Sequence, residues 1–256
     1  MSYRAVEVLT SAALVIAEDT RHSRRLLDHY RITTPLSSYH EHNEAKETPR
    51  LIARLRAGDS IALISDAGTP LISDPGSRLV AAAVEAGLPV VPIPGPSSVM
   101  AALVASGMSL ERFTFYGFLP RKGKERAEVI EEIVRSRTTS VVFEAPNRVG
   151  ATLEALVQGG AGDRPAVVAR EITKQFEEFK RGGVGELATL YSEVDPKGEV
   201  VLVIAGGEAP VVSETELGDA ARKLKASGKR PREVMEQLVT AFGAPRNLAY
   251  KIAHED

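Results

Sequence analysis

The 256-residue sequence contains no cysteine, which excludes disulfide bonds, thiolate metal sites and cysteine nucleophiles. It also lacks any apolar run near the roughly 20 residues that a membrane span needs. The N-terminal segment carries acidic residues within its apolar stretch and does not have the layout of a signal peptide. These absences predict a cytoplasmic protein with no membrane partner.

Several common catalytic motifs are missing as well. No G-x-G-x-x-G follows the first predicted strand, and neither G-x-x-x-x-G-K-[ST] nor G-x-S-x-G occurs. A standard Rossmann site, a P-loop and a nucleophile elbow are therefore not supported. Only His40, Glu41 and His42, with Glu44, resemble a metal cluster. Adjacent strand residues point to opposite faces, whereas residues i and i+2 can converge, and we expect no metal there.

What the sequence does contain is a regular alternation of short apolar runs and segments with helical spacing of apolar residues. Strands are predicted at Leu14–Ala17, Ile61–Ile64, Val90–Ile93, Phe113–Phe118, Ser140–Phe143, Ala166–Arg170 and Val200–Ala205. Helices are predicted at Thr48–Arg56, Leu79–Ala86, Val99–Ser106, Arg126–Arg135 and Val149–Val157. Strands separated by helices indicate an α/β fold built from parallel units.

The chain divides into three predicted parts. Residues 1–112 and 113–208 each read as an α/β domain, with the boundary near Arg112, where a new strand begins. Ala209–Ser213 reads as a linker. Residues 213–256 then read as a tail of two or three short helices, with breaks at Ala226–Pro231 and Gly243–Pro245.

Two loops rich in small residues follow predicted strands of the first domain. The first is IALISDAGTPLISDPG at residues 61–76, and the second is IPGPSS at residues 93–98. Small residues at a strand exit let backbone amides approach a ligand closely. Two ordinary turns are the alternative, but a pair of such exits in one α/β sheet favours a small-molecule site.

Polar residues also follow three other strands, in the strings AEDTR (17–21), FEAPNRV (143–149) and AREITK (169–174). Carboxylates at such exits can orient a nucleophile or accept a proton, and arginine suits phosphate recognition. The structural alternative is ion pairing between the domains, for which Arg148 and Arg170 are the candidates.

Charge is distributed unevenly along the chain, although the net charge is only −2. Residues 222–251 contain eight Lys or Arg against two Glu, a local net charge of +6. A second basic cluster comprises Arg121, Lys122, Lys124 and Arg126. Such clusters are commonly solvated faces, but two of them make a polyanionic partner worth testing.

Taken together, these strings resemble one family. AEDTR (17–21), SDAGTPLISDPG (65–76), PGPSS (94–98), GFLPRKGKER (117–126), FEAPNRV (143–149), AREITKQFEE (169–178) and GEVVLVIAG (198–206) are similar to the ribosomal small subunit methyltransferase I family. The likeness runs in order over nearly the whole chain. It implies a two-domain tetrapyrrole-methylase-like fold with a helical C-terminal tail. It also implies a homodimer that uses S-adenosylmethionine to 2′-O-methylate a cytidine of 16S ribosomal RNA in the 30S subunit.

The resemblance also assigns expected roles to residues. The methyl donor would meet Ala67, Gly68, Thr69 and Ile72, with Ser97 and Ser98 nearby. Asp19 and Arg21 would face the substrate, and Asn147, Arg148, Arg170 and Glu171 would line the later domain's side. Lys229, Arg230 and Arg232 of the tail would hold RNA. Asp19 or Glu171 would accept the proton of the ribose hydroxyl.

One departure from the family pattern concerns the N-terminus. Family members begin with one more strand and a loop resembling Pro-Ile-Gly-Asn-Leu, whereas this sequence starts at the following helix, Ser2–Ser11. We expect the loss of that strand to expose a sheet edge and open one side of the donor site. Two other functions stay open. The shared fold allows a tetrapyrrole methyltransferase, and the missing strand allows a catalytically impaired RNA-binding remnant.

Overall fold

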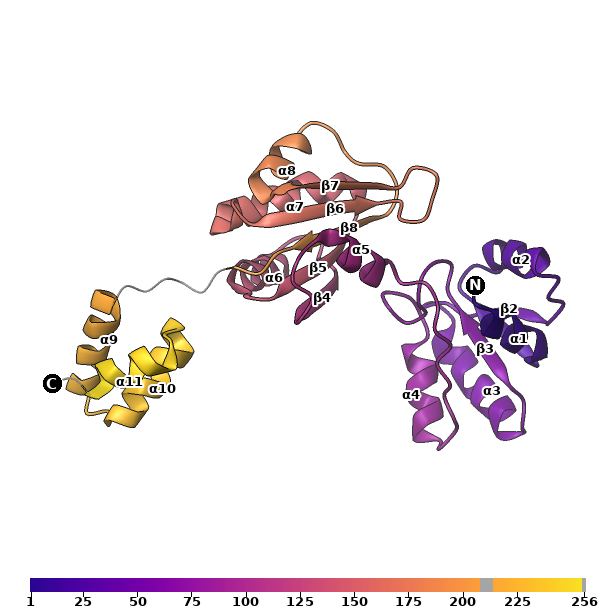
Figure 1. Ribbon diagram of the computed structural model, residues 1–256. Helices are drawn as coiled ribbons and strands as arrows, with labels where there is room; N and C mark the ends of the chain where they lie inside the picture. Colours follow the sequence, from indigo (N-terminus) through magenta and orange to yellow (C-terminus); the bar gives the residue numbers. More distant parts are fainter. Residues whose placement is uncertain (208–213, 255–256) are drawn as a thin grey trace.

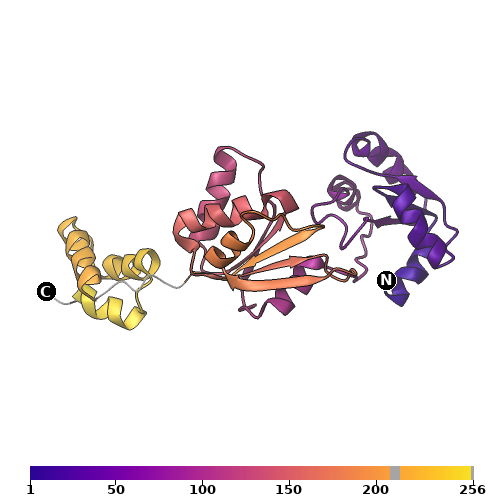
Figure 2. The ribbon, with the colours of Figure 1, turned by 90° about the horizontal axis from the view of Figure 1, so that it is seen from above.

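The computed structural model describes residues 1–207 and 214–254 of the chain. Figure 1 shows three bodies in chain order: an early α/β domain, a later α/β domain and a helical tail. The view from above in Figure 2 separates the same three bodies, with the later domain between the other two.

The early domain is built on a parallel three-stranded sheet of order β2-β1-β3. Its strands are β1 (Leu14–Ala17), β2 (Leu36–Ser38) and β3 (Ile61–Ile64). Its helices are α1 (Tyr3–Ser11), α2 (Thr20–His29), α3 (Glu44–Arg56) and α4 (Ser77–Glu85). All four residues of β1 are buried because helices cover both faces of the sheet. The predicted parallel arrangement is confirmed for this domain.

The outer edge of β3 pairs with no strand among the described residues, whereas β1 is paired on both sides. The apolar run Val90–Ile93, which we predicted as a strand, is not one. Val90 and Val91 are 46% and 62% exposed. The prediction was wrong because an apolar run becomes a strand only when a neighbouring strand supplies its hydrogen bonds.

The later domain contains a five-stranded sheet of order β4-β5-β8-β6-β7. Its strands are β4 (Phe113–Phe118), β5 (Thr139–Glu144), β6 (Pro165–Arg170), β7 (Glu178–Gly183) and β8 (Val200–Ile204). Only β4 and β5 run parallel, and the other pairs are antiparallel. The expectation of parallel units is therefore wrong here, because β6 and β7 form a hairpin and β8 inserts between β5 and β6.

Alternate residues of the later strands face two separate apolar cores, as the pleat of a strand requires. One core joins Val142, Val168 and Leu202 to helices α6 (Lys124–Arg135), α7 (Val149–Leu156) and α8 (Val184–Leu190). A short 3-10 helix, Pro146–Arg148, precedes α7, and a π-helical turn, Val157–Ala161, follows it.

The opposite face of the later sheet is covered by α5 (Ser98–Ser106). Val99, Ala102 and Leu103 of this helix pack on the alternate strand residues Val141, Val167, Val201 and Val203. Residues 98–106 therefore already pack on the later sheet, although we predicted the domain limit near residue 112. That limit remains a prediction.

The tail consists of three helices, α9 (Glu214–Ala226), α10 (Pro231–Phe242) and α11 (Arg246–His254), as the predicted breaks imply. They share an apolar core of their own that includes Leu217, Val234 and Leu238. The predicted linker at 209–213 lies outside the described residues. No helix in residues 1–207 or 214–254 is long and apolar enough to cross a membrane.

Candidate active site

The first glycine-rich loop, residues 65–76, leaves β3 beside the end of β1. The backbone amide of Asp19, just after β1, donates a hydrogen bond to Asp66 Oδ1 at 3.4 Å. Within the loop, Ser65 Oγ donates to the carbonyl oxygen of Ala67 at 3.1 Å. Because parallel strands end on the same edge of a sheet, the polar exits of β1 and β3 form one surface.

The two predicted glycine-rich loops contact each other directly. Thr69 Oγ1 donates a hydrogen bond to the carbonyl oxygen of Pro96 at 2.9 Å. Ser97 caps α5, with its Oγ accepting a hydrogen bond from the amide of Met100 at 3.3 Å, and Ser98 is the first residue of that helix. The two loops thus lie together, while their contact with a donor remains a prediction.

The backbone of the first loop is unusual for its residue types. Leu71 and Ser73 adopt φ angles of +72° and +63°, and Gly68 adopts +71°. Side chains rarely tolerate this left-handed region, and such strain clusters where a binding site holds the backbone in place. A Cβ atom added to Gly68 would meet no atom within 4 Å, so the space beside its backbone is open.

Asp19 acts as the N-cap of α2. Its carboxylate accepts hydrogen bonds from the amides of Arg21 (2.8 Å) and His22 (3.4 Å). It also forms an ion pair with the Arg21 guanidinium (3.2 Å). The Arg21 hydrogen bonds hold the pKa of Asp19 at about 2. Asp19 is therefore a fully ionised anchor that orients Arg21, whose side chain is 91% exposed.

Glu171 holds a second strained turn, in the later domain. It adopts a φ angle of +49°, and Thr173 follows at +68°. Its carboxylate accepts hydrogen bonds from the Glu199 amide (3.0 Å) and from Lys174 Nζ (2.9 Å), which lower its pKa. Gly198 leaves the room for this carboxylate, because a Cβ atom there would collide with it.

The two polar strings of the later domain lie at one edge of its sheet. Glu144 at the end of β5 and Arg170 at the end of β6 both pair with Val200 of the strand between them. Arg170 Nε donates to Glu178 at 2.8 Å, within the same domain. Asn147 is exposed beside this edge. The topology thus brings together residues that are 26 positions apart in the chain.

The first glycine-rich loop of the early domain lies next to strand β4 of the later domain. A Cβ atom on Gly117 of β4 would lie 3.5 Å from Ser73 Oγ. Burial raises the pKa of the neighbouring Asp74, and the carboxylates of Glu18, Asp66 and Glu199 raise it further, although a hydrogen bond to Ser65 opposes the shift. Asp74 could not be recognised from the sequence, because its surroundings come from both domains.

The chain is similar in sequence to known methyltransferases over its whole length. Residues 1–188 match the sequence profile described as Tetrapyrrole (Corrin/Porphyrin) Methylases. A relative from Synechocystis sp., named Ribosomal RNA small subunit methyltransferase I, is 44% identical over 100% of this chain and 92% of its own length. A relative of the same name from Halalkalibacterium halodurans is 39% identical over 100% of this chain and 90% of its own length.

The chain belongs to the ribosomal RNA small subunit methyltransferase I family.

Solved structures of other methyltransferases share the fold of this family member. A diphthine synthase aligns with a TM-score of 0.62 and 18% identity, covering 80% of this chain and 84% of its own. A uroporphyrin-III C-methyltransferase from Thermus thermophilus, solved with S-adenosyl homocysteine, aligns with a TM-score of 0.57 and 18% identity, covering 80% and 90%. At these identities the likeness shows the fold alone.

A buried ionic network supports the later domain of this methyltransferase family member. The fully buried Glu144 carboxylate contacts Arg126 (3.4 Å), Arg148 (3.2 Å) and Thr152 Oγ1 (2.6 Å). Arg148 also donates to the carbonyl oxygens of Leu119 (3.0 Å) and Pro120 (2.8 Å). Arg148 and Arg170 therefore pair within the later domain, and the suggestion that they join the two domains is wrong.

Two of the three tail cations expected to bind RNA form ion pairs with glutamates of helix α10. Arg230 and Arg232, 87% and 86% exposed, form ion pairs with Glu233 (3.9 Å) and Glu236 (3.2 Å). Lys229 is half-buried beside them. Their contact with RNA remains a prediction, and local ion pairs of this exposed kind are weak enough to be exchanged for phosphate.

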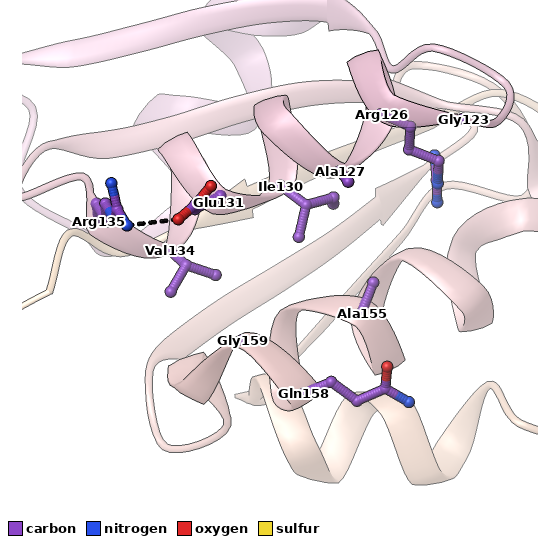
Figure 3. A pocket seen from close by; sticks show the side chains of 10 residues that line it. All are labelled: Gly123, Arg126, Ala127, Ile130, Glu131, Val134, Arg135, Ala155, Gln158 and Gly159. Carbon is purple, nitrogen blue, oxygen red and sulfur yellow. Dashed lines mark hydrogen bonds and ion pairs between the residues drawn. The ribbon is translucent and has the colours of Figure 1, made fainter.

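A groove of about 720 Å³ lies away from both glycine-rich loops, between α6 and the end of α7. Figure 3 shows Ile130, Val134 and Ala155 facing this space, with the Glu131–Arg135 ion pair at its rim. None of the predicted site residues lines it. The groove lacks the left-handed backbone and the polar strand exit found at the first glycine-rich loop. No group of three or more His, Asp or Glu in the described parts of the chain is placed to hold a metal ion.

Proposed function

We propose that this chain transfers a methyl group from S-adenosylmethionine to the 2′-oxygen of a cytidine in 16S ribosomal RNA. The observation that supports this most is the extent of the likeness to relatives named for ribosomal RNA. That likeness covers 100% of the chain, tail included, at 44% identity. The tetrapyrrole methylase profile, by contrast, ends at residue 188.

The two joined loops suit a donor that is held mainly by backbone atoms. Ala67, Gly68, Thr69 and Ile72 would hold it from the first loop, and Ser97 and Ser98 from the second. The open space beside Gly68 and the left-handed backbone around it support this assignment. The donor supplies an already activated methyl group, so the chain's own task is alignment.

Alignment of the ribose is assigned to the polar exits on both sides. Arg21 at the end of β1, and Asn147, Arg148 and Arg170 at the later sheet's edge, would position the nucleotide. The 2′-hydroxyl must also lose its proton, which Asp19 or Glu171 would accept directly or through water. Both have lowered pKa values and are weak bases, so Asp74, with its raised pKa, joins them as a third candidate.

A transfer assay tests the proposal. The purified chain is incubated with S-adenosylmethionine carrying a labelled methyl group and, in parallel, with 30S subunits or a tetrapyrrole. We expect label in 16S RNA at one cytidine, mapped by reverse transcription at low nucleotide concentration. Label in the tetrapyrrole alone would overturn the proposal. Binding of 30S without any donor binding in calorimetry would identify an RNA-binding remnant instead.

The remaining expectations follow from the same assignment. A ribosomal substrate implies a cytoplasmic site of action. We also propose a homodimer, supported by the exposed apolar side chains of Met100 and Val104, which are 49% and 68% exposed one turn apart on α5. Light scattering at micromolar concentration distinguishes the dimer from the monomer.

A further inference from the structure

Helix α2 presents a basic face on which only Arg21 has an assigned role. Its buried residues, Ser23 and Leu27, lie on one side of the helix. Arg21, Arg24 and Arg25 follow the i, i+3, i+4 spacing that places side chains on a common face, here the opposite one. The segment from Asp19 to Arg31 contains four arginines against two aspartates.

Arg24 and Arg25 are available to bind a partner, whereas Arg21 is already paired. Arg21 is engaged with Asp19, but neither Arg24 nor Arg25 forms an ion pair with a described residue, and Arg25 is exposed. In contrast, Arg230 and Arg232 of the tail each have a glutamate partner. A stripe of unpaired guanidinium groups is suited to phosphate, which they bind through paired N–H donors.

The position of α2 links this stripe to the active site. The helix begins at its cap Asp19, whose amide is bound to Asp66 of the donor loop. At 1.5 Å per residue, Arg25 lies about 9 Å along the helix from Asp19. That distance corresponds to the nucleotides next to a target, rather than to the target itself. Figures 1 and 2 show α2 at the opposite end of the molecule from the tail, so the two basic surfaces are separate.

We propose that Arg24 and Arg25 of α2 bind backbone phosphates of the ribosomal RNA next to the methylated nucleotide. This inference rests on the proposed function. RNA is favoured over a membrane because Leu26, 37% exposed, is the one large apolar side chain that α2 exposes. A membrane-surface helix needs a broad apolar face opposite its charges.

The test compares two double variants with the wild type. Arg24→Ala with Arg25→Ala removes the stripe, and Lys46→Ala with Arg56→Ala removes two exposed cations of α3 that form no ion pair with a described residue. Affinity for naked 16S RNA is measured at several salt concentrations. The loss of two phosphate contacts reduces the salt slope by about 1.4 and weakens binding about 25-fold at 0.1 M salt. The α3 variant should bind like the wild type.

Three outcomes would overturn the inference. The first is unchanged RNA affinity in the α2 variant while the wild type methylates 30S subunits. The second is weaker binding to 30S but not to naked RNA, which would indicate a protein contact. The third is a parallel loss of donor affinity in calorimetry, which would indicate a folding role for α2. Failure of the proposed function is distinguishable, because the wild type itself would then not methylate 30S subunits.

Discussion

Replacement of Glu144 by alanine should strongly destabilise the later domain. The carboxylate is completely buried, while the Arg126 and Arg148 side chains beside it are only 15% and 21% exposed. Removing the carboxylate leaves two cations with little water to replace it. It also removes the acceptor for Thr152 Oγ1 and for the Ala145 amide. Breaking a buried ion pair from one side costs about 3–5 kcal/mol, and the residual exposure of the arginines favours the lower end.

Calorimetry measures this effect in the intact chain. For a domain of this size, about 3 kcal/mol corresponds to a drop of roughly 12 °C or more in the midpoint of its transition. Glu128→Ala is the matched control, because its ion pair with Lys124 lies on the exposed side of α6, with side chains 59% and 90% exposed. That variant should stay within about 0.5 kcal/mol of the wild type. A Glu144→Ala midpoint equal to that of the control would show that the buried ion pairs do not stabilise the later domain.

Three other predictions concern the loops, the tail and pH. Gly68→Val should weaken donor binding in calorimetry, because a β-branched residue resists the φ angle of +71° and fills the open space; unchanged affinity would count against the loop assignment. Replacing Lys229, Arg230 and Arg232 by alanine should weaken 30S binding and flatten its salt dependence, whereas normal binding would make the tail a packing element. Asp19→Asn should lower the melting temperature. Since the folded pKa of about 2 lies below the ordinary 3.8, this difference should persist above pH 4 and vanish toward pH 2; a difference that grows in acid would contradict the cap.

Much of the fold follows from local sequence. The bounds of β1, β3 and β4 coincide with apolar runs that end in polar or small residues. β7, Glu178–Gly183, has no such run, and it is a strand because β6 pairs with it along its full length. Val90–Ile93 shows the converse, an apolar run without a pairing partner. Strand formation in both cases depends on contacts that a local pattern does not contain.

The site divides in the same way. The first glycine-rich loop could be recognised because small residues at a strand exit are a local signal, whereas the second follows Val90–Ile93, which is not a strand. The network around Glu144 could not, because Arg126 and Thr152 reach it from two different helices. Asp74 was missed for a similar reason, since Glu18 and Glu199, which raise its pKa, lie far from it in sequence. Local motifs thus indicate where ligands bind, while the chemistry of each carboxylate depends on tertiary contacts.

The segment around Pro96 belongs to two structures at once. Its carbonyl oxygen is held by Thr69 of the early domain, and two residues later the chain enters α5, which packs on the later sheet. A displacement of the first loop is therefore also a displacement of the helix that covers the other domain. In hydrogen exchange, such a shared element opens with whichever domain opens first. The Thr69–Pro96 hydrogen bond therefore links the position of the first loop to the placement of α5 on the later sheet.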